Sequence, residues 1–195
     1  MPDRPNVLLV TTDQQSAGAM SCAGNDDLRT PAMDGLAATG TRFPNAYCAE
    51  PLCVPSRASM FTGRMPHEVR DDVSYEDGFE GPHREEGLGH LFRDAGYDTG
   101  YAGKWHVPHF EMQGDHGFEP ICGFDDTAVA DACIDFMDRD RDDPFLLVAS
   151  FDNPHNICEW SRGQNLPWGE IEDVPAAECP DLPENFAIPP FEPAE

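Results

Sequence analysis

Apolar runs and amphipathic segments alternate along the chain as far as His155. The runs 6–12 and 144–151 are short and rich in aliphatic and β-branched residues, and 97–102 is a further strand candidate. Continuous apolar runs of this length are typical of parallel strands that are covered on both faces. We therefore expect three strands of a buried, largely parallel sheet.

Four other segments have the features of helices. Thr30 is a candidate N-cap with Pro31 at the first helical position, and this helix is expected to end at Gly40. A second helix is expected over 56–62, with Gly63 as its stop. The other two are marked by apolar residues on one face: Leu88, Leu91, Phe92 and Ala95 before a stop at Gly96, and Val129, Ala132, Cys133, Phe136 and Met137. The alternation predicts an α/β fold with a largely parallel sheet flanked by helices.

Polar residues follow each predicted strand. They are Asp13 and Gln14 after the first, Gly103-Lys104-Trp105-His106 after the second, and Asp152-Asn153-Pro154-His155 after the third. Ligands of open α/β sheets collect at the carboxyl ends of the strands. We expect a functional site where these three clusters meet.

Length and composition are those of a single folded domain of 195 residues, 39% of them hydrophobic. Prolines and acids dominate from residue 165, which predicts an extended connection over 165–195. No apolar run reaches membrane-spanning length, and residues 1–5 lack a signal-peptide core, so we expect a cytoplasmic location. Seven cysteines without a disulfide-scaffold pattern also suit a reducing compartment.

The formal charge of −25 argues against nucleic acid and anionic membranes as partners, since both are bound by clusters of Lys and Arg. Lys104 is the only lysine, and the other eleven of the twelve basic residues are arginines. An acidic surface repels anions, so any anionic ligand must be held by local positive charge. A single lysine in such a chain favours a functional role for Lys104.

The segment Cys53-Val54-Pro55-Ser56-Arg57 opens the second predicted helix. Pro55 suits a first helical turn, which places Cys53 just before a helix N-terminus. Free N–H groups and the helix dipole favour negative charge there, and Arg57 lies about one turn further on. An oxyanion at position 53 would therefore be stabilised.

Other cysteine chemistries fit this segment less well. A phosphatase-type loop needs a longer spacing between cysteine and arginine than Cys53 to Arg57 allows. Cys48 and Cys53 do not form a Cys-x-x-Cys redox pair, and no cysteines have the spacing of a structural zinc site. His106 and His109 are not assigned to zinc either, because matching partners are missing.

Cys53 to Arg57, continued by Thr62-Gly63, resembles the signature of the type I sulfatases of the alkaline-phosphatase-like superfamily. In that family the cysteine is oxidised to formylglycine (3-oxoalanine) after translation. The resemblance runs from about Asn6 to the last residues but covers only the amino-terminal portion of the family's domain. It implies that 1–164 form that portion and that 165–195 end before the rest.

The resemblance also implies roles for individual residues. Asp13, Gln14 and the formylglycine made from Cys53 would bind one divalent metal, normally Ca²⁺, which takes oxygen ligands. Lys104 and His106 would bind the sulfate. Further roles follow for Arg57, which would neutralise charge on the sulfuryl oxygens, and for His155, which would contact the substrate or protonate the leaving group.

The implied activity is that of a sulfuric ester hydrolase. One hydroxyl of the hydrated aldehyde would attack sulfur and displace the alcohol of a small-molecule or carbohydrate sulfate ester. A formylglycine-generating maturation enzyme is the implied protein partner. Two alternatives stay open: a phosphonate or phosphate ester hydrolase of the same superfamily, and a non-catalytic remnant in which Cys53 is an ordinary thiol.

Several histidine-containing segments are set aside. Asp115-His116-Gly117 continues as Phe118 and matches the family's early His-Gly-Phe segment, not its late metal motif. His67, His83 and His90 are expected to be surface or packing residues. The family's late metal ligands have no counterpart here, which predicts a fragment with an incomplete Ca²⁺ site and an unpaired sheet edge.

Overall fold

The computed structural model describes residues 4–69, 87–107, 116–166 and 175–182. The chain divides into two compact units. The larger unit combines Met1–Ser16 with Phe43–Trp168, and the smaller one combines Ala17–Arg42 with Gly169–Glu195. No helix of the described residues is both long and apolar enough to cross a membrane.

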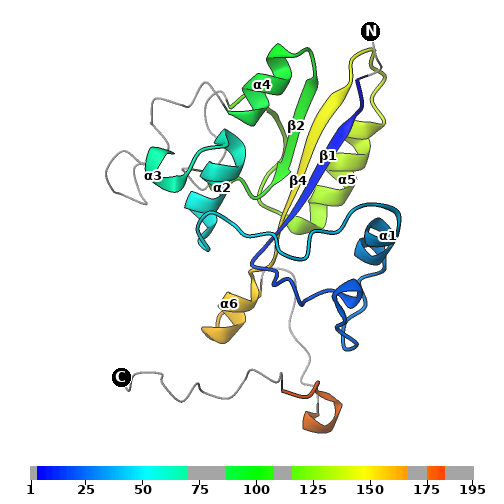
Figure 1. Ribbon diagram of the computed structural model, residues 1–195, viewed down its shortest axis with the longest axis vertical. Coiled ribbons are helices and arrows are strands. Elements are labelled where there is room, and N and C mark those ends of the chain that lie inside the picture. The colour runs from blue at the N-terminus through cyan, green and yellow to red at the C-terminus, as the bar shows by residue number, and fades with distance from the viewer. Residues whose placement is uncertain (1–3, 70–86, 108–115, 167–174, 183–195) are drawn as a thin grey trace. The chain divides into compact units, whose positions relative to one another are not determined.

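The larger unit is built on a four-stranded sheet in the order β1-β4-β2-β3. The strands are β1 (Val7–Asp13), β2 (Asp98–Gly103), β3 (Glu119–Cys122) and β4 (Phe145–Pro154). All three neighbouring pairs are parallel, and Figure 1 shows β4 between β1 and β2. The predicted α/β fold with a parallel sheet is therefore confirmed, although the sequence did not indicate β3.

Helices cover both faces of this sheet. Consecutive residues of β4 point to opposite faces, and Val148 packs with α2 (Cys53–Thr62) whereas Leu147 packs with α5 (Asp126–Met137). The first core contains Ala58, Phe61, Tyr101, Trp105 and Val107, and it also receives Leu88 of α4 (Leu88–Asp94). The second contains Ala102, Val129, Cys133, Phe136 and Phe145. Two short helices, α3 (Pro66–Val69) and α6 (Ile157–Ser161), complete the unit.

Strand β1 lies at one edge of the sheet, and the prediction that it is buried holds for one face only. Leu9 packs against the α2 side, but Leu8 is 48% and Val10 54% exposed. These two side chains point to the other face, where α5 packs over β4, β2 and β3. Because α5 does not extend over β1, Leu8 and Val10 are not covered by this helix.

Two helix predictions need correction. Helix α2 begins at Cys53, with Leu52 as N-cap, and not at residue 56. Proline is tolerated anywhere in a first turn, because those N–H groups have no partner within the helix, so Pro55 does not mark the first residue. In α4 the predicted apolar face is correct only in part: Leu88 packs against the first core, but Leu91 is 58% exposed, and Gly89 and His90 are buried instead. The ring of Phe118 packs so close to Gly89 that a Cβ there would lie 2.6 Å from it.

The smaller unit contains η1 (Ser21–Ala23), α1 (Pro31–Thr39) and η3 (Ala176–Glu178). Thr30 is the N-cap of α1 and Pro31 its first residue, as predicted, but the Thr30 side chain makes no capping bond. Its hydroxyl instead accepts a hydrogen bond of 2.9 Å from the Ser21 amide. Residues 165, 166 and 175–182 are the described part of the predicted extended segment, whose role stays a prediction.

Candidate active site

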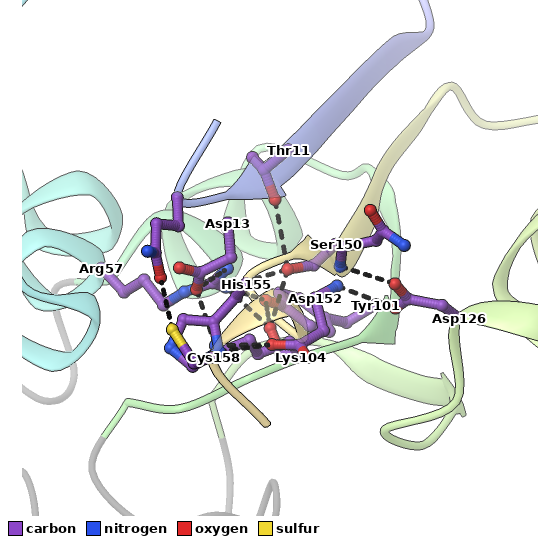
Figure 2. Close-up of polar contacts among 12 residues, drawn as sticks. Thr11, Asp13, Arg57, Tyr101, Lys104, Asp126, Ser150, Asp152, His155 and Cys158 are labelled. Atoms are coloured by element: carbon purple, nitrogen blue, oxygen red, sulfur yellow. Dashed lines mark hydrogen bonds and ion pairs between the residues drawn. The ribbon is translucent and has the colours of Figure 1, made fainter. Parts of the chain in front are cut away.

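The carboxyl ends of β1, β2 and β4 bring three charged side chains together, as Figure 2 shows. Nζ of Lys104 lies 2.8 Å from Oδ2 of Asp13 and 2.7 Å from Oδ1 of Asp152. Lys104 is 1% exposed, and the side chains of Asp152 and Asp13 are 4% and 10% exposed. The lone lysine of the chain is thus a buried cation held between two carboxylates.

Arg57 joins this cluster from the second turn of α2. Its Nη2 lies 3.2 Å from Oδ2 of Asp13, and its Nη1 donates to the Lys104 carbonyl at 2.7 Å and to Ser150 Oγ at 2.8 Å. The guanidinium is therefore fixed by both a charge and the backbone that carries Lys104. Two cations share the Asp13 carboxylate.

Opposing effects set the ionisation of Asp13. Burial raises the pKa of this carboxyl, whereas the hydrogen bond from Lys104 and the charges of Lys104 and Arg57 lower it. The cations outweigh burial, so the pKa lies below its usual 3.8 and Asp13 is ionised at neutral pH.

A network of hydrogen bonds fixes the backbone of Lys104. Its carbonyl accepts from Tyr101 at 2.7 Å and from Ser150 Oγ at 2.8 Å, in addition to Arg57. Ser150 Oγ in turn accepts from Thr11 at 3.1 Å. Burial raises the pKa of Tyr101, which keeps its hydroxyl protonated as a donor. The backbone at Lys104, just beyond the end of β2, is therefore held in place by three hydrogen bonds to its carbonyl.

Five of the predicted site residues line one cavity of about 800 Å³ in the larger unit: Asp13, Gln14, Cys53, Arg57 and His155. The signature helix contributes Cys53 at its first residue, where the helix N-terminus favours negative charge. His155 follows β4, and its Nδ1 lies 3.8 Å from Oδ1 of Asp152. A cysteine, a guanidinium and an imidazole thus share one cavity.

The remaining two predicted site residues, Lys104 and His106, are not among the described residues that line this cavity. Lys104 and His106 do not follow the alternation of a strand, because β2 ends at Gly103 and the backbone at His106 is left-handed, with φ 49°. Burial, then the charges of Lys104 and Arg57, lower its pKa below 6.5, so the imidazole is neutral at pH 7.

The oxygen donors for a metal fit in kind but are few. Asp13 and Gln14 offer a carboxylate and an amide oxygen beside Cys53, and such hard donors suit Ca²⁺. The Gln14 oxygen accepts a hydrogen bond from the Cys158 thiol at 3.4 Å. Within the described residues, no group of three or more His, Cys, Asp or Glu side chains is arranged to hold a metal ion.

The other histidines lie outside this cavity. His67 is exposed on α3 and His90 is buried in α4, in agreement with their predicted surface and packing roles. His116 packs on Trp105, with 4.7 Å between ring centroids. His83, His109 and Asp115 fall outside the described residues.

Sequence reasoning missed two polar residues that hold the site together. Tyr101 and Ser150 both lie inside predicted strands, where their side chains were indistinguishable from ordinary strand residues. Asp152 was placed at the site only as part of a polar cluster. The signal that could have separated these residues is a polar side chain near the carboxyl end of an otherwise apolar strand.

The fold and the site define an α/β protein with a charged, cysteine-containing cavity at the carboxyl edge of a parallel sheet. The sequence model of the sulfatase family matches residues 5–187, so the chain belongs to the sulfatase family. This confirms the resemblance that the Cys53 signature indicated.

Several relatives are similar over most of this chain. The Delta 4,5-hexuronate-2-O-sulfatase of Bacteroides thetaiotaomicron is 31% identical over 95% of this chain and 41% of that protein. The structure of a 2-O GAG sulfatase superposes with a TM-score of 0.75 at 27% identity, over 94% of this chain and 42% of that one. A structure solved in complex with its substrate D-glucosamine-2-N,6-O-disulfate superposes with a TM-score of 0.64 at 31% identity, over 78% of this chain and 35% of that one. The chain spans less than half of the length of each.

Proposed function

We propose that the chain takes part in the hydrolysis of sulfate esters, with a formylglycine made from Cys53 as the nucleophile. One observation carries the proposal: Cys53, at the first residue of α2, lines the same cavity as Asp13, Gln14, Arg57 and His155. The family match supplies the sulfate chemistry, and the cavity brings together the residue types which that chemistry needs.

The nucleophile is a hydroxyl of the hydrated aldehyde at position 53. It would give its proton to a base and attack sulfur, and the bond between sulfur and the ester oxygen would break. The second hydroxyl would then expel sulfate and restore the aldehyde. The N-terminus of α2 and the Arg57 guanidinium favour the negative charge that develops on the sulfuryl oxygens. His155 lies at the edge of the same cavity and gives a proton to the departing alcohol oxygen.

A divalent metal, Ca²⁺ by the oxygen character of the donors, would be held by Asp13 and Gln14 together with the formylglycine. When bound it supplies electrostatic stabilisation of the sulfate group. The low pKa of Asp13 keeps that carboxylate ionised and ready to bind a cation. The ammonium of Lys104, 2.8 Å from Oδ2 of Asp13, favours the ionised form of this carboxylate.

The proposed substrate is a sulfate ester of a carbohydrate. Relatives are named for hexuronate and glucosamine sulfates, which is the support for this class. In a chain of charge −25, Arg57, which lines the cavity, provides the local positive charge that a sulfate group needs. A formylglycine-generating enzyme is the proposed maturation partner.

Mass spectrometry of the Cys53 peptide, in protein from its native source, tests the nucleophile. An aldehyde or its hydrate at position 53 is expected. A plain thiol in every molecule would contradict the proposal and leave a non-catalytic member of the family.

Parallel assays of the matured chain on an aryl sulfate and an aryl phosphonate test the reaction. Faster turnover of the sulfate is expected, and faster turnover of the phosphonate would assign the chain to phosphonate ester hydrolysis. Cys53→Ala should abolish turnover, whereas Cys179→Ala, which changes an exposed cysteine, should leave it intact. Absence of turnover with both esters would refute hydrolysis by this chain.

A further inference from the structure

Strand β4 carries a bulge at the end that forms the site. Thr11 of β1 pairs with Ser150, but Asp13 pairs with Pro154, so the pairing advances two residues along β1 and four along β4. The pairing of β4 with β2 ends at Ser150. Residues 151–153 therefore leave the regular ladder, and such bulges redirect side chains beside active sites.

Asp126, the first residue of α5, binds this bulge with both carboxylate oxygens. Oδ1 accepts from the Asp152 amide at 2.8 Å, and Oδ2 accepts from the Asn153 amide at 2.7 Å (Figure 2). Two successive amides that have left the ladder would otherwise need water as a partner. Hydrogen bonds to an ionised carboxylate are shorter and stronger than those between neutral groups.

The bulge determines where two site residues lie. Asp152 points to Lys104, at 2.7 Å, and its carbonyl accepts from the His155 amide at 2.9 Å to close the turn that carries His155. Asp126 itself is not among the described residues that line the cavity. Its influence on the site therefore runs through the backbone of β4.

We propose that Asp126 is a positioning residue, whose carboxylate holds the β4 bulge so that Asp152 anchors Lys104 and His155 faces the cavity. The effect on turnover rests on the proposed function. The effect on Lys104 does not, because it follows from the hydrogen bonds alone.

The neighbouring residue offers a matched control. Asp125 is the N-cap of α5, and its carboxylate accepts from the Thr127 amide at 3.0 Å and from the Thr127 hydroxyl. Asp125→Asn and Asp126→Asn remove the same charge at the same end of the same helix. Only the second change alters the acceptor of the β4 amides.

The single lysine makes a direct readout possible. With lysine labelled by ¹⁵N, the chain gives one side-chain ammonium signal, from Lys104. Its rate of acetylation by an N-hydroxysuccinimide ester reports how well the ammonium is enclosed. In Asp126→Asn we expect a change in the chemical shift of the Lys104 ammonium signal. We also expect acetylation of Lys104 to accelerate by about tenfold or more, because displacement of the β4 backbone in a closely packed site exposes the ammonium to the reagent.

Asp125→Asn should keep the wild-type Lys104 signal and acetylation rate, because asparagine caps a helix about as well as aspartate. A wild-type signal and rate in Asp126→Asn would overturn the inference. So would an equal change in both variants, because the effect would then come from the start of α5 in general. The inference is supported if the Lys104 signal and acetylation rate are those of wild type in Asp125→Asn but change in Asp126→Asn. This result supports it even if no ester is turned over.

Turnover provides the second arm. For a chain that hydrolyses an aryl sulfate, Asp126→Asn should lower kcat by about 10- to 100-fold, the range expected when reacting groups are displaced by about 1 Å. Amide hydrogen exchange of the wild-type chain needs no variant. Protection of the Asp152 and Asn153 amides is expected, and exchange of both at the rate of exposed amides would refute the proposed role.

Discussion

The ammonium of Lys104 lies 2.8 Å from Oδ2 of Asp13, although Asp13 ends β1, Lys104 follows β2, and these two strands are not neighbours in the sheet. Strand β4 separates them, and its residue Asp152 binds the same ammonium from the other side. A buried cation between two carboxylates links all three strands at the edge where the cavity opens.

Replacement of Lys104 should therefore cost much more than loss of a surface ion pair. Lys104→Met leaves two buried carboxylates with Arg57 as the remaining cation, and breaking a buried pair in this way costs about 3–5 kcal/mol. The free energy of unfolding from urea titrations at neutral pH measures it. The loss should shrink in acid, where Asp13 becomes protonated.

The ion pair between Arg139 and Glu119 is the comparison, since both side chains are more than 40% exposed. Glu119→Gln should cost about 1 kcal/mol or less. Equal losses for Lys104→Met and Glu119→Gln would show that the buried cluster contributes no more than a surface pair.

The hydroxyl of Ser150 should contribute to stability through the groups it satisfies. Ser150→Ala removes an acceptor of Arg57 and Thr11 and a donor to the Lys104 carbonyl. Unsatisfied buried groups of this kind cost about 1–3 kcal/mol. Ser161→Ala removes an exposed hydroxyl bonded to the Cys158 carbonyl, so it should lie within about 0.5 kcal/mol of wild type. Denaturant titration of both variants measures the free energy of unfolding. Similar losses in the two variants would contradict a stabilising role for the Ser150 hydroxyl.

A methyl group at Gly103 should disrupt the site. The residue has φ 90°, and a Cβ there would lie 2.0 Å from the Ser150 carbonyl oxygen, so the backbone before Lys104 must move. Gly63 also has a positive φ, 69°, but a Cβ there meets nothing within 4 Å. Gly63→Ala should cost about 1–2 kcal/mol from conformation alone, and Gly103→Ala clearly more. Thermal unfolding of the pair tests this, and equal melting temperatures would refute the close contact.

His106 should make stability depend on pH near neutrality. Its pKa in the folded chain lies below 6.5, mainly because of burial, so the unfolded chain binds the proton more tightly. The free energy of unfolding should therefore fall as the pH drops from about 7 through the unfolded pKa and towards the folded pKa. His106→Gln should remove this part of the slope, whereas His67→Gln on the exposed face of α3 should keep it. An unchanged slope in His106→Gln would assign the effect to other groups.

The sequence was informative where a single physical rule acted. Apolar runs located β1 and β4, and the Pro31 and Gly63 signals located one end each of α1 and α2. The short strand Glu119–Cys122 was missed because Pro120 and four residues of length give no pattern. Burial on both faces was over-predicted for β1, since a run of apolar residues does not tell which strand lies at an edge.

At the site, the sequence indicated residues but not their connections. Asp13, Arg57 and Lys104 were each chosen from strand ends and spacing, whereas their shared ion-pair cluster depends on strand order, which no local pattern encodes. The bulge in β4 depends on its register with β1 and could not be predicted either. The role of Asp126 could not be inferred from the sequence, because acidic residues are common in the first turn of a helix.

The pairing of β1 with β4 also has a consequence for biosynthesis. Thr11 and Ser150 bond across 139 positions of the sequence, and Leu9 lies opposite Val148. As the chain leaves the ribosome, β1 emerges before β4, which is its partner strand among the described residues. During that interval its apolar row is available to other chains, and exposed strands of this kind make incomplete chains prone to aggregate.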